Sequence, residues 1–414
     1  MTVSRRAFLA SSAAAAVTVA ASRTADAAEP RAADAAELGA PSDRADRGAR
    51  VDPWLEVLPS AIEHNVRTLS HLAGGRSILA VAKNNAYGLG LRTAGPILAR
   101  LREVWGLAVV RADEAFALHD AGVRKPILLM GPATDAQAAD LVAGGVRLAA
   151  FTDDAAARLG AAARRVRKPA TVHLYVDTGM HRMGFPHGRA LPWIEALAAR
   201  KELRIEGVFT ELTEDAEFDR EQVQRCRALV EAARARGIAL GRAHAASSDA
   251  IMRPNDATFL DLVRPGITVY GGYPTEESRA RGELQSAYRL KARVIRVDNL
   301  APGEGISYHR RWVAAQPTTI ATLAIGHVDG YPTGAVKGCE VMIGAKLYPV
   351  VGTVSASHTV VAIGDSSLVR VGDEATLVGP DAPALHPNEV AKRSGWSEYN
   401  MFMHLNAGLA RRVV

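Results

Sequence analysis

The chain has 414 residues, a length that predicts two or three domains, or one large barrel with a small partner domain. Hydrophobic residues make up 48% and charged residues 23%, which excludes a chain that is disordered throughout, and two cysteines are too few for a disulfide framework. The net charge of +6 is spread along the sequence and gives no reason to expect a nucleic-acid partner.

The first residues have the pattern of a twin-arginine signal peptide. Arg5 and Arg6 precede an uncharged, alanine-rich run of sixteen residues, 7–22, which is shorter than the roughly 18 that a membrane span needs. A small-x-small cleavage pattern, Ala25-Asp26-Ala27, follows. We therefore expect residues 1–27 to direct export to the periplasm or the medium, without a stable membrane span. A disordered alanine-rich tail is the alternative.

Residues 28–50 have no apolar period and predict a disordered linker.

The middle of the chain alternates short apolar runs with segments of helical spacing, such as Asp153–Arg164 and Phe218–Ala235. The apolar runs are Ile78–Ala82, Trp105–Val110, Pro126–Met130, Val146–Phe151, Thr171–Val176, Ile205–Thr210, Ala243–Ala246 and Phe259–Val263. Eight such units over about 190 residues predict an α/β fold, a (β/α)8 TIM-type barrel. An open doubly wound sheet is the alternative, but no glycine-rich fingerprint follows the first run.

From about residue 285 the pattern changes to runs rich in Val, Ile and Thr, separated by Gly, Asp and Pro. These runs are Ala292–Val297, Thr319–Ile325, Glu340–Ile343, Leu347–Val351, Thr359–Ile363 and Ala375–Leu377. They predict a C-terminal all-β domain over residues 285–414. The barrel would occupy 51–284, led by a short strand, Trp54–Val57, that could join the sheet of the β-domain.

Active sites of such barrels lie at the carboxyl ends of the strands, and phosphate groups often bind after strands seven and eight. The residues that follow the apolar runs include Lys83, Glu211, Ser248 and Arg264. A lysine, an arginine and hydroxyl- or glycine-containing loops suit a phosphorylated aldehyde held as a Schiff base. The alternative for the lysine is a solvated surface residue.

Five segments resemble, in order, the successive motifs of the alanine racemase family. They are Lys83–Gly88 (KNNAYG), Val176–Phe185 (VDTGMHRMGF), Val263–Gly271 (VRPGITVYG), Gly305–Tyr308 (GISY) and Ile325–Tyr331 (IGHVDGY). The resemblance extends from about Trp54 to the C-terminus. It implies a pyridoxal 5′-phosphate (PLP) enzyme with a fold-type III barrel followed by a β-domain.

The resemblance also implies two bases and a dimer. Lys83 would hold PLP as an internal aldimine and act as one base, and Tyr308 of the other subunit would act as the opposite base. Racemisation needs both, because the proton leaves one face of the substrate and returns on the other. The expected assembly is a head-to-tail homodimer.

Further roles follow from the same resemblance. Arg264 would face the pyridine nitrogen and, as a permanent cation, keep it unprotonated. Arg182 would bind the substrate carboxylate, unless it is only a surface ion pair. His244 is expected to be a hydrogen-bonding core residue, and no metal site is expected. The positions that match the family's phosphate contacts are Tyr87, Ser248, Gly266, Ile267 and Tyr399.

Some positions depart from the family pattern on the substrate side. Glu211 stands where the family has a histidine that contacts the catalytic tyrosine, and a carboxylate there would oppose phenolate formation unless it is protonated. Tyr175 stands where many members have a lysine that orients the carboxylate-binding arginine. His327 replaces a tyrosine of the substrate entryway. Ala356 and Ser357 replace a methionine and an aspartate. Arg310 and Arg311 add positive charge close to Tyr308.

The sequence therefore predicts a divergent, exported amino-acid racemase. Alanine is the default substrate, and Ala356 could widen the range of side chains at the substrate site. Neutral drift around an ordinary alanine site is the alternative explanation of the changes. A PLP-dependent lyase or epimerase on the same scaffold, or a PLP-binding protein without activity, are the other functions considered.

Overall fold

The computed structural model of this protein describes residues 52–254, 257–364 and 368–414. The expected signal peptide, 1–27, and linker, 28–50, lie outside the described residues.

Within the described chain, eight parallel strands form a barrel, as predicted. Their order is β5-β4-β3-β2-β10-β9-β8-β6, and β5 also pairs with β6, which closes the ring. The strands are β2 (Ser77–Val81), β3 (Val104–Val109), β4 (Ile127–Leu129), β5 (Arg147–Ala150), β6 (Ala170–Asp177), β8 (Leu203–Phe209), β9 (Arg242–His244) and β10 (Leu262–Val263), with the short β7 (Phe185–Pro186) beside β6. Each of the eight predicted apolar runs overlaps one barrel strand, because strands that are buried on both faces are largely apolar.

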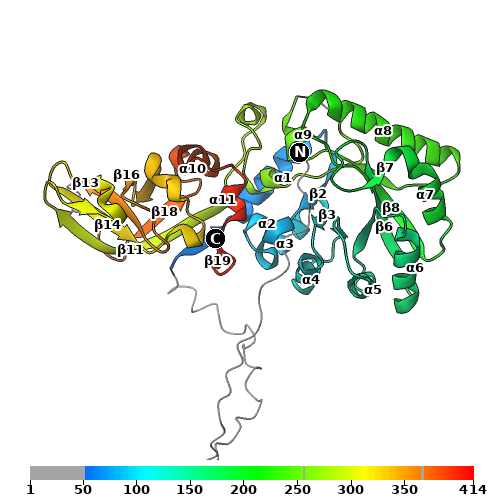
Figure 1. The fold of residues 1–414 in the computed structure, drawn as a ribbon, viewed down its shortest axis with the longest axis horizontal. Coiled ribbons are helices and arrows are strands. Elements are labelled where there is room, and N and C mark those ends of the chain that lie inside the picture. Colours follow the sequence, from blue (N-terminus) through cyan, green and yellow to red (C-terminus); the bar gives the residue numbers. More distant parts are fainter. Residues whose placement is uncertain (1–51, 255–256, 365–367) are drawn as a thin grey trace, which may run out of the picture. The chain divides into compact units, whose positions relative to one another are not determined.

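The helices between these strands cover the barrel from outside, as α4 to α8 show in Figure 1. In α8, Val223, Cys226, Leu229 and Ala233 recur at helical spacing and are buried. The helices of this part are α1 (Pro59–Leu72), α2 (Lys83–Tyr87), α3 (Leu91–Arg100), α4 (Ala112–Asp120), α5 (Asp135–Ala143), α6 (Ala155–Val166), α7 (Ala190–Ala198), α8 (Ala216–Ala235) and α9 (Ser248–Met252). The 3-10 helix η3 (Ile267–Tyr270) follows β10.

The C-terminal part contains a sheet of order β14-β17-β16-β15-β18-β11-β1-β19. Its strands are β1 (Trp54–Val57), β11 (Tyr288–Leu300), β14 (Thr318–Leu323), β15 (Glu340–Ile343), β16 (Lys346–Val351), β17 (Thr359–Gly364), β18 (Glu374–Val378) and β19 (Ala410–Val413). Neighbours are antiparallel, except that β1 runs parallel to β19. The leading strand β1 is thus hydrogen-bonded into this sheet. A hairpin of β12 (Gly305–Ile306) and β13 (Trp312–Val313) and two helices, α10 (Pro387–Ser394) and α11 (Asn400–Met403), complete this part.

β11 is longer than the run Ala292–Val297 that predicted it, since it begins at Tyr288. Its first half alternates buried and half-buried residues. Arg289 and Lys291 take the outward positions, so a search for continuous apolar residues misses this part.

None of the helices in the described ranges has both the length and the apolar character that crossing a membrane requires.

Candidate functional site

Lys83 opens the site at the end of β2, where the chain enters a left-handed turn. Asn84, Asn85, Ala86 and Tyr87 have φ angles of 53°, 59°, 54° and 52°. This conformation costs an L-residue roughly 1–2 kcal/mol, so neighbouring groups must hold the turn in place.

Glu114 on α4 supports the turn from the side of the neighbouring strand β3. Its Oε1 accepts a hydrogen bond from the Asn85 N–H at 3.2 Å, and its Oε2 accepts one from each of the N–H groups of Val110 and Arg111 at 3.2 Å. The Asn85 side chain in turn accepts the N–H of Leu91 at 2.9 Å. One buried carboxylate therefore joins the lysine-bearing turn to the next β/α loop.

The C-terminal part holds the turn from its other end. Arg411 donates from Nη2 and Nε to the carbonyl of Gly88, at 2.7 and 3.2 Å. A Cβ atom on Gly88 would lie 2.3 Å from the Phe402 carbonyl oxygen, so only glycine permits this approach. The side-chain amide of Asn84 contacts Sδ of Met403 at 3.3 Å. The turn after Lys83 is thus fixed by residues of both parts of the fold.

The turn brings Tyr87 against the loops after β9 and β10. Tyr87 is buried and stacks on Tyr270, with ring centroids 5.1 Å apart. A Cβ atom on Gly266 would lie 2.2 Å from Tyr87 Oη. The Gly266 N–H donates to Ser248 Oγ at 2.8 Å, and Ser248 Oγ lies 2.9 Å from Thr268 Oγ1. Tyr87, Ser248 and Gly266, three of the five expected phosphate contacts, therefore meet at one point.

The other two expected contacts lie close to this point. Ile267 begins η3, where the first N–H groups have no acceptor within the helix itself. Tyr399 precedes α11 and is near enough to Tyr87 for the two hydroxyls to interact electrostatically. Burial raises the pKa of Tyr87 well above its ordinary value, and burial with the charge of Glu214 raises the pKa of Tyr399 to about 12. Both hydroxyls remain protonated at neutral pH and can donate hydrogen bonds.

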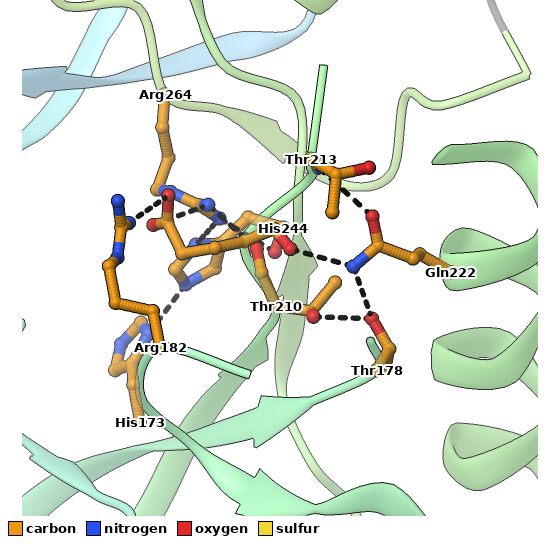
Figure 2. Close-up of polar contacts among 9 residues, drawn as sticks. His173, Thr178, Arg182, Thr210, Thr213, Gln222, His244 and Arg264 are labelled. Atoms are coloured by element: carbon orange, nitrogen blue, oxygen red, sulfur yellow. Dashed lines mark hydrogen bonds and ion pairs between the residues drawn. The ribbon is translucent and has the colours of Figure 1, made fainter. Parts of the chain in front are cut away.

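Arg264 lies at the centre of the site and is 3% exposed. Its Nη1 donates to the carbonyl and to Nδ1 of His244, at 2.8 and 3.0 Å, and its Nη2 donates to the Thr210 carbonyl at 2.7 Å and to Glu211 Oε1 at 3.0 Å (Figure 2). The guanidinium also lies over the ring of Phe209, 5.3 Å from its centroid. Within the described residues these four bonds use only Nη1 and Nη2, which leaves the Nε–H for a ligand.

A histidine pair extends from Arg264 into the barrel interior. Because a guanidinium only donates, Nδ1 of His244 must accept, so the proton of the neutral ring is on Nε2. That Nε2 lies 2.8 Å from Nδ1 of His173, which then accepts in turn (Figure 2). His173 Nε2 is 3.6 Å from Oε2 of Glu206, close enough for electrostatic attraction, and Glu206 is paired with Arg147 at 2.8 Å. His244 thus has the structural role expected of it.

Glu211 lies between Arg264 and Arg182. Its Oε2 is 3.5 Å from Nη2 of Arg182, whose side chain is 60% exposed, while its Oε1 binds Arg264. Tyr175 contacts Arg182, and its ring stacks on that of Phe209 with the centroids 4.4 Å apart. Burial and the charge of Glu211 raise the pKa of Tyr175 to about 12, so this phenol is neutral.

A buried amide fixes the backbone around Glu211. Gln222 Nε2 donates to the Glu211 carbonyl at 2.9 Å and to Thr178 Oγ1 at 3.3 Å, and its Oε1 accepts the Thr213 N–H at 3.0 Å. Thr178 Oγ1 lies 2.6 Å from Thr210 Oγ1. Figure 2 shows these side chains on the side of the site opposite Arg182. The loop after β8 is therefore attached to the loop after β6.

Tyr308, Ala356 and His327 lie apart from this group, in the C-terminal part. Tyr308 is 70% exposed in a short 3-10 turn between β12 and β13, and no hydrogen bond, ion pair or ring contact among the described residues joins it to the barrel. The exposed Ala356 accepts the Val328 N–H at 3.1 Å, beside His327. One chain thus brings together the barrel side of the expected site and leaves Tyr308 facing solvent.

Comparison with known proteins agrees with this geometry. Family models of the N-terminal and C-terminal domains of alanine racemase match residues 57–274 and 287–413. An alanine racemase of Desulforamulus reducens is 36% identical over 367 residues, which cover 86% of this chain and 98% of that protein. The chain belongs to the alanine racemase family. Enzymes of this family depend on PLP, and the protein is accordingly an amino-acid racemase, an isomerase.

Solved alanine racemases have the same fold. That of Clostridium difficile 630 superposes with a TM-score of 0.80 and 28% identity, over 87% of this chain and 95% of that one. That of Bacillus anthracis, solved with bound L-Ala-P, gives a TM-score of 0.76 and 28% identity, over 88% and 95% of the two chains.

The residues present fit PLP. Two protonated tyrosines, a serine hydroxyl and backbone N–H groups are donors suited to a phosphate, and Gly266 has no side chain to block it. Ser247 Oγ, next to Ser248, is buried and lacks a partner within the described structure. The Nε–H of Arg264, which has no acceptor among the described residues, could donate to a pyridine nitrogen. No group of three or more His, Cys, Asp or Glu residues in the described ranges is arranged to hold a metal ion.

Several supporting residues were not found from the sequence. Each of these residues has a contact that is distant in the sequence, and none lies in one of the family motifs. They are Glu114, which binds Asn85, His173, which binds His244, Phe209, which packs under Arg264, and Gln222, which binds Thr178. The only signal for Glu114 was its place three residues into a helix, where a carboxylate often accepts backbone N–H groups.

We expect acid to destabilise the folded protein over the range in which unfolded histidines titrate. Burial lowers the pKa of His244, with the charge of Arg264 adding to it, and burial also lowers the pKa of His173. Unfolded histidines take up protons near pH 6.5, while these two stay neutral in the fold. The free energy of unfolding should therefore fall between about pH 7 and pH 5, by up to about 1.4 kcal/mol per pH unit for each histidine.

Urea unfolding at constant ionic strength measures this slope. His173→Asn should reduce it, whereas the substitution of an exposed histidine, His119→Asn, should leave it unchanged. Stability that stays level or rises toward pH 5 in the wild-type protein would contradict the assignment of neutral rings.

Proposed function

We propose that this protein interconverts L- and D-alanine, and amino acids with somewhat larger side chains, by PLP-dependent two-base proton transfer. The observation that carries the proposal is that Lys83 opens the turn which brings Tyr87 to Ser248 and Gly266, beside a buried Arg264. The similar proteins reported above are named alanine racemase, which supports alanine as the substrate.

PLP, when bound, withdraws electrons from the substrate and so acidifies its Cα–H bond. The residues of the chain then divide the remaining tasks. Lys83 binds the cofactor aldehyde and moves a proton at its Nζ on one face, and the Tyr308 hydroxyl moves a proton on the opposite face. Arg182 orients the substrate carboxylate through its guanidinium.

The wider substrate range rests on the loop between β16 and β17. By the resemblance to the family, Ala356 stands in place of a methionine, which shortens the side chain, and Ser357 stands in place of an aspartate, which removes a charge. Both residues are exposed. With the shorter side chain of Ala356 on its wall, the substrate site accepts a substrate side chain larger than a methyl group.

The direct test is a chiral substrate panel on the purified protein with PLP. Incubation with L-alanine and then with other L-amino acids should yield the D-enantiomer by chiral chromatography. Lys83→Ala should abolish both the visible absorbance of bound cofactor and turnover, and the matched control Lys201→Ala, at an exposed position, should keep both. Keto acids or aldehydes without any D-enantiomer would instead support a lyase.

We also infer that two chains share each site in a head-to-tail homodimer. The support is the exposure of Tyr308 in this chain, accompanied in the same domain by exposed Val313 and Val328. A catalytic phenol that meets none of the described barrel residues of its own chain requires a second chain to supply the barrel. Covering these apolar side chains would favour the association.

Mixing two inactive variants tests the shared site. Tyr308→Phe should lose turnover but keep PLP, since it removes a base and no phosphate contact. Lys83→Ala should lose both. If chains exchange at random, about a quarter of all sites in an equal mixture combine an intact Lys83 with an intact Tyr308, so activity should recover to about that fraction. A mixture that stays inactive after proven subunit exchange argues for sites within one chain.

Export by the twin-arginine route is a further part of the proposal. It is supported by Arg5 and Arg6 before the alanine-rich run and by family matches that begin only at residue 57. Replacing both arginines by lysine should retain the protein in the cytoplasm of a host with this pathway, as shown by cell fractionation. Unchanged export of the double variant would reject the route.

A further inference from the structure

We propose that Glu211 is a positioning residue that holds the cofactor-side Arg264 and the substrate-side Arg182 in one arrangement. This inference rests on the proposed function, since it assumes that the two arginines face PLP and the substrate carboxylate. Nothing in the resemblance assigns the role, because Glu211 is a departure from the family pattern.

The contacts use one carboxylate oxygen for each arginine. Oε1 accepts from Arg264 Nη2 at 3.0 Å, and Oε2 lies 3.5 Å from Arg182 Nη2. A single planar group therefore fixes the separation of two guanidinium groups. Asparagine or aspartate, shorter by one methylene, could not reach both.

Glu211 is the only acidic partner of Arg264 among the described residues. The other acceptors of this buried cation are two carbonyl oxygens and a neutral imidazole nitrogen. A buried charge needs compensation, and here one carboxylate provides it. Loss of the charge would leave more positive potential beside the pyridine nitrogen.

Arg182 depends on Glu211 for a different reason. Its side chain is 60% exposed, so without partners it would sample many rotamers, and its binding geometry would have to be formed anew with each substrate. Glu211 and Tyr175 restrict it before the substrate arrives. The ion pair itself is worth little in water, so its effect is on orientation.

The position of the carboxylate is itself rigid. The backbone of Glu211 is held by the fully buried Gln222, which also binds Thr178 and Thr213. The side chain leaves this fixed loop and is only 23% exposed. Glu211 thus connects the exposed Arg182 to a rigid part of the barrel.

Two substitutions separate charge from position. Glu211→Gln removes the charge but keeps the length, and Glu211→Asp keeps the charge but loses the reach. Glu217→Gln is the matched control, because it removes a carboxylate that is exposed, six residues away, and unpaired with either arginine among the contacts of the described residues.

The first measurement is KM and kcat with L-alanine on PLP-saturated protein. We expect KM to rise roughly tenfold in both Glu211 variants, with kcat changed less than about threefold, because both lose the fixed geometry of Arg182. Glu217→Gln should match the wild type. A wild-type KM in Glu211→Asp would overturn the proposal, since charge alone would then suffice.

The second measurement does not use activity. The visible absorbance of bound cofactor is titrated with pH in each variant. Its midpoint should move to lower pH in Glu211→Gln, because the site has become more positive, and should stay near the wild-type value in Glu211→Asp. An unshifted midpoint in Glu211→Gln would show that the carboxylate does not act on the cofactor side.

A double variant tests the route through Arg182. In an Arg182→Lys background, Glu211→Gln should raise KM by less than about twofold, whereas independent effects would multiply. Thermal unfolding monitors the fold of each variant, and Glu211→Asp serves alone if Glu211→Gln is unstable. A wild-type protein that binds PLP without racemising any amino acid refutes the proposed function, while the absorbance titration still decides whether Glu211 acts on the cofactor.

Discussion

A guanidinium group that cannot lose its proton is buried in the centre of the site, and the neighbouring residues are arranged to satisfy it. Arg264 is 3% exposed and donates to two carbonyl groups, one imidazole and one carboxylate. Because it only donates, it fixes the tautomer of His244 and, through it, that of His173. Burial lowers the pKa of His244, and the charge of Arg264 adds to this shift. Arg264 therefore sets the tautomers of two buried histidines in the barrel interior.

The second constraint is the left-handed turn after Lys83, which stores strain in four consecutive residues. Glu114 holds it from the barrel, and Arg411 holds it from the C-terminal part. The turn held in this way places Tyr87 against Gly266. The β-domain thus contributes to the expected cofactor side of the site through its C-terminal segment, in addition to carrying Tyr308.

The barrel could be predicted because each of its strands overlaps a short, largely apolar run, and the ends of these runs pointed to Lys83, Ser248 and Arg264. The prediction of the β-domain was less complete, since β11 carries charged residues on its outer face and the last strand, β19, contains two arginines. The supporting shell could not be predicted, because pairs such as Asn85 and Glu114 or His173 and His244 are distant in sequence and form only in the closed barrel. Whether Glu211 repels or stabilises charge likewise depends on contacts that no local pattern specifies.

Those contacts change the meaning of the substitution at Glu211. Considered alone, a carboxylate at this position opposes the ionisation of a nearby phenol. In the fold it is paired with Arg182 and Arg264, so the cluster carries one more positive than negative charge. A Tyr308 hydroxyl brought to this cluster by a second chain would meet two guanidinium groups as well as the carboxylate. A carboxylate can therefore replace the family's histidine without making a basic tyrosine impossible, provided that both arginines remain in contact with it.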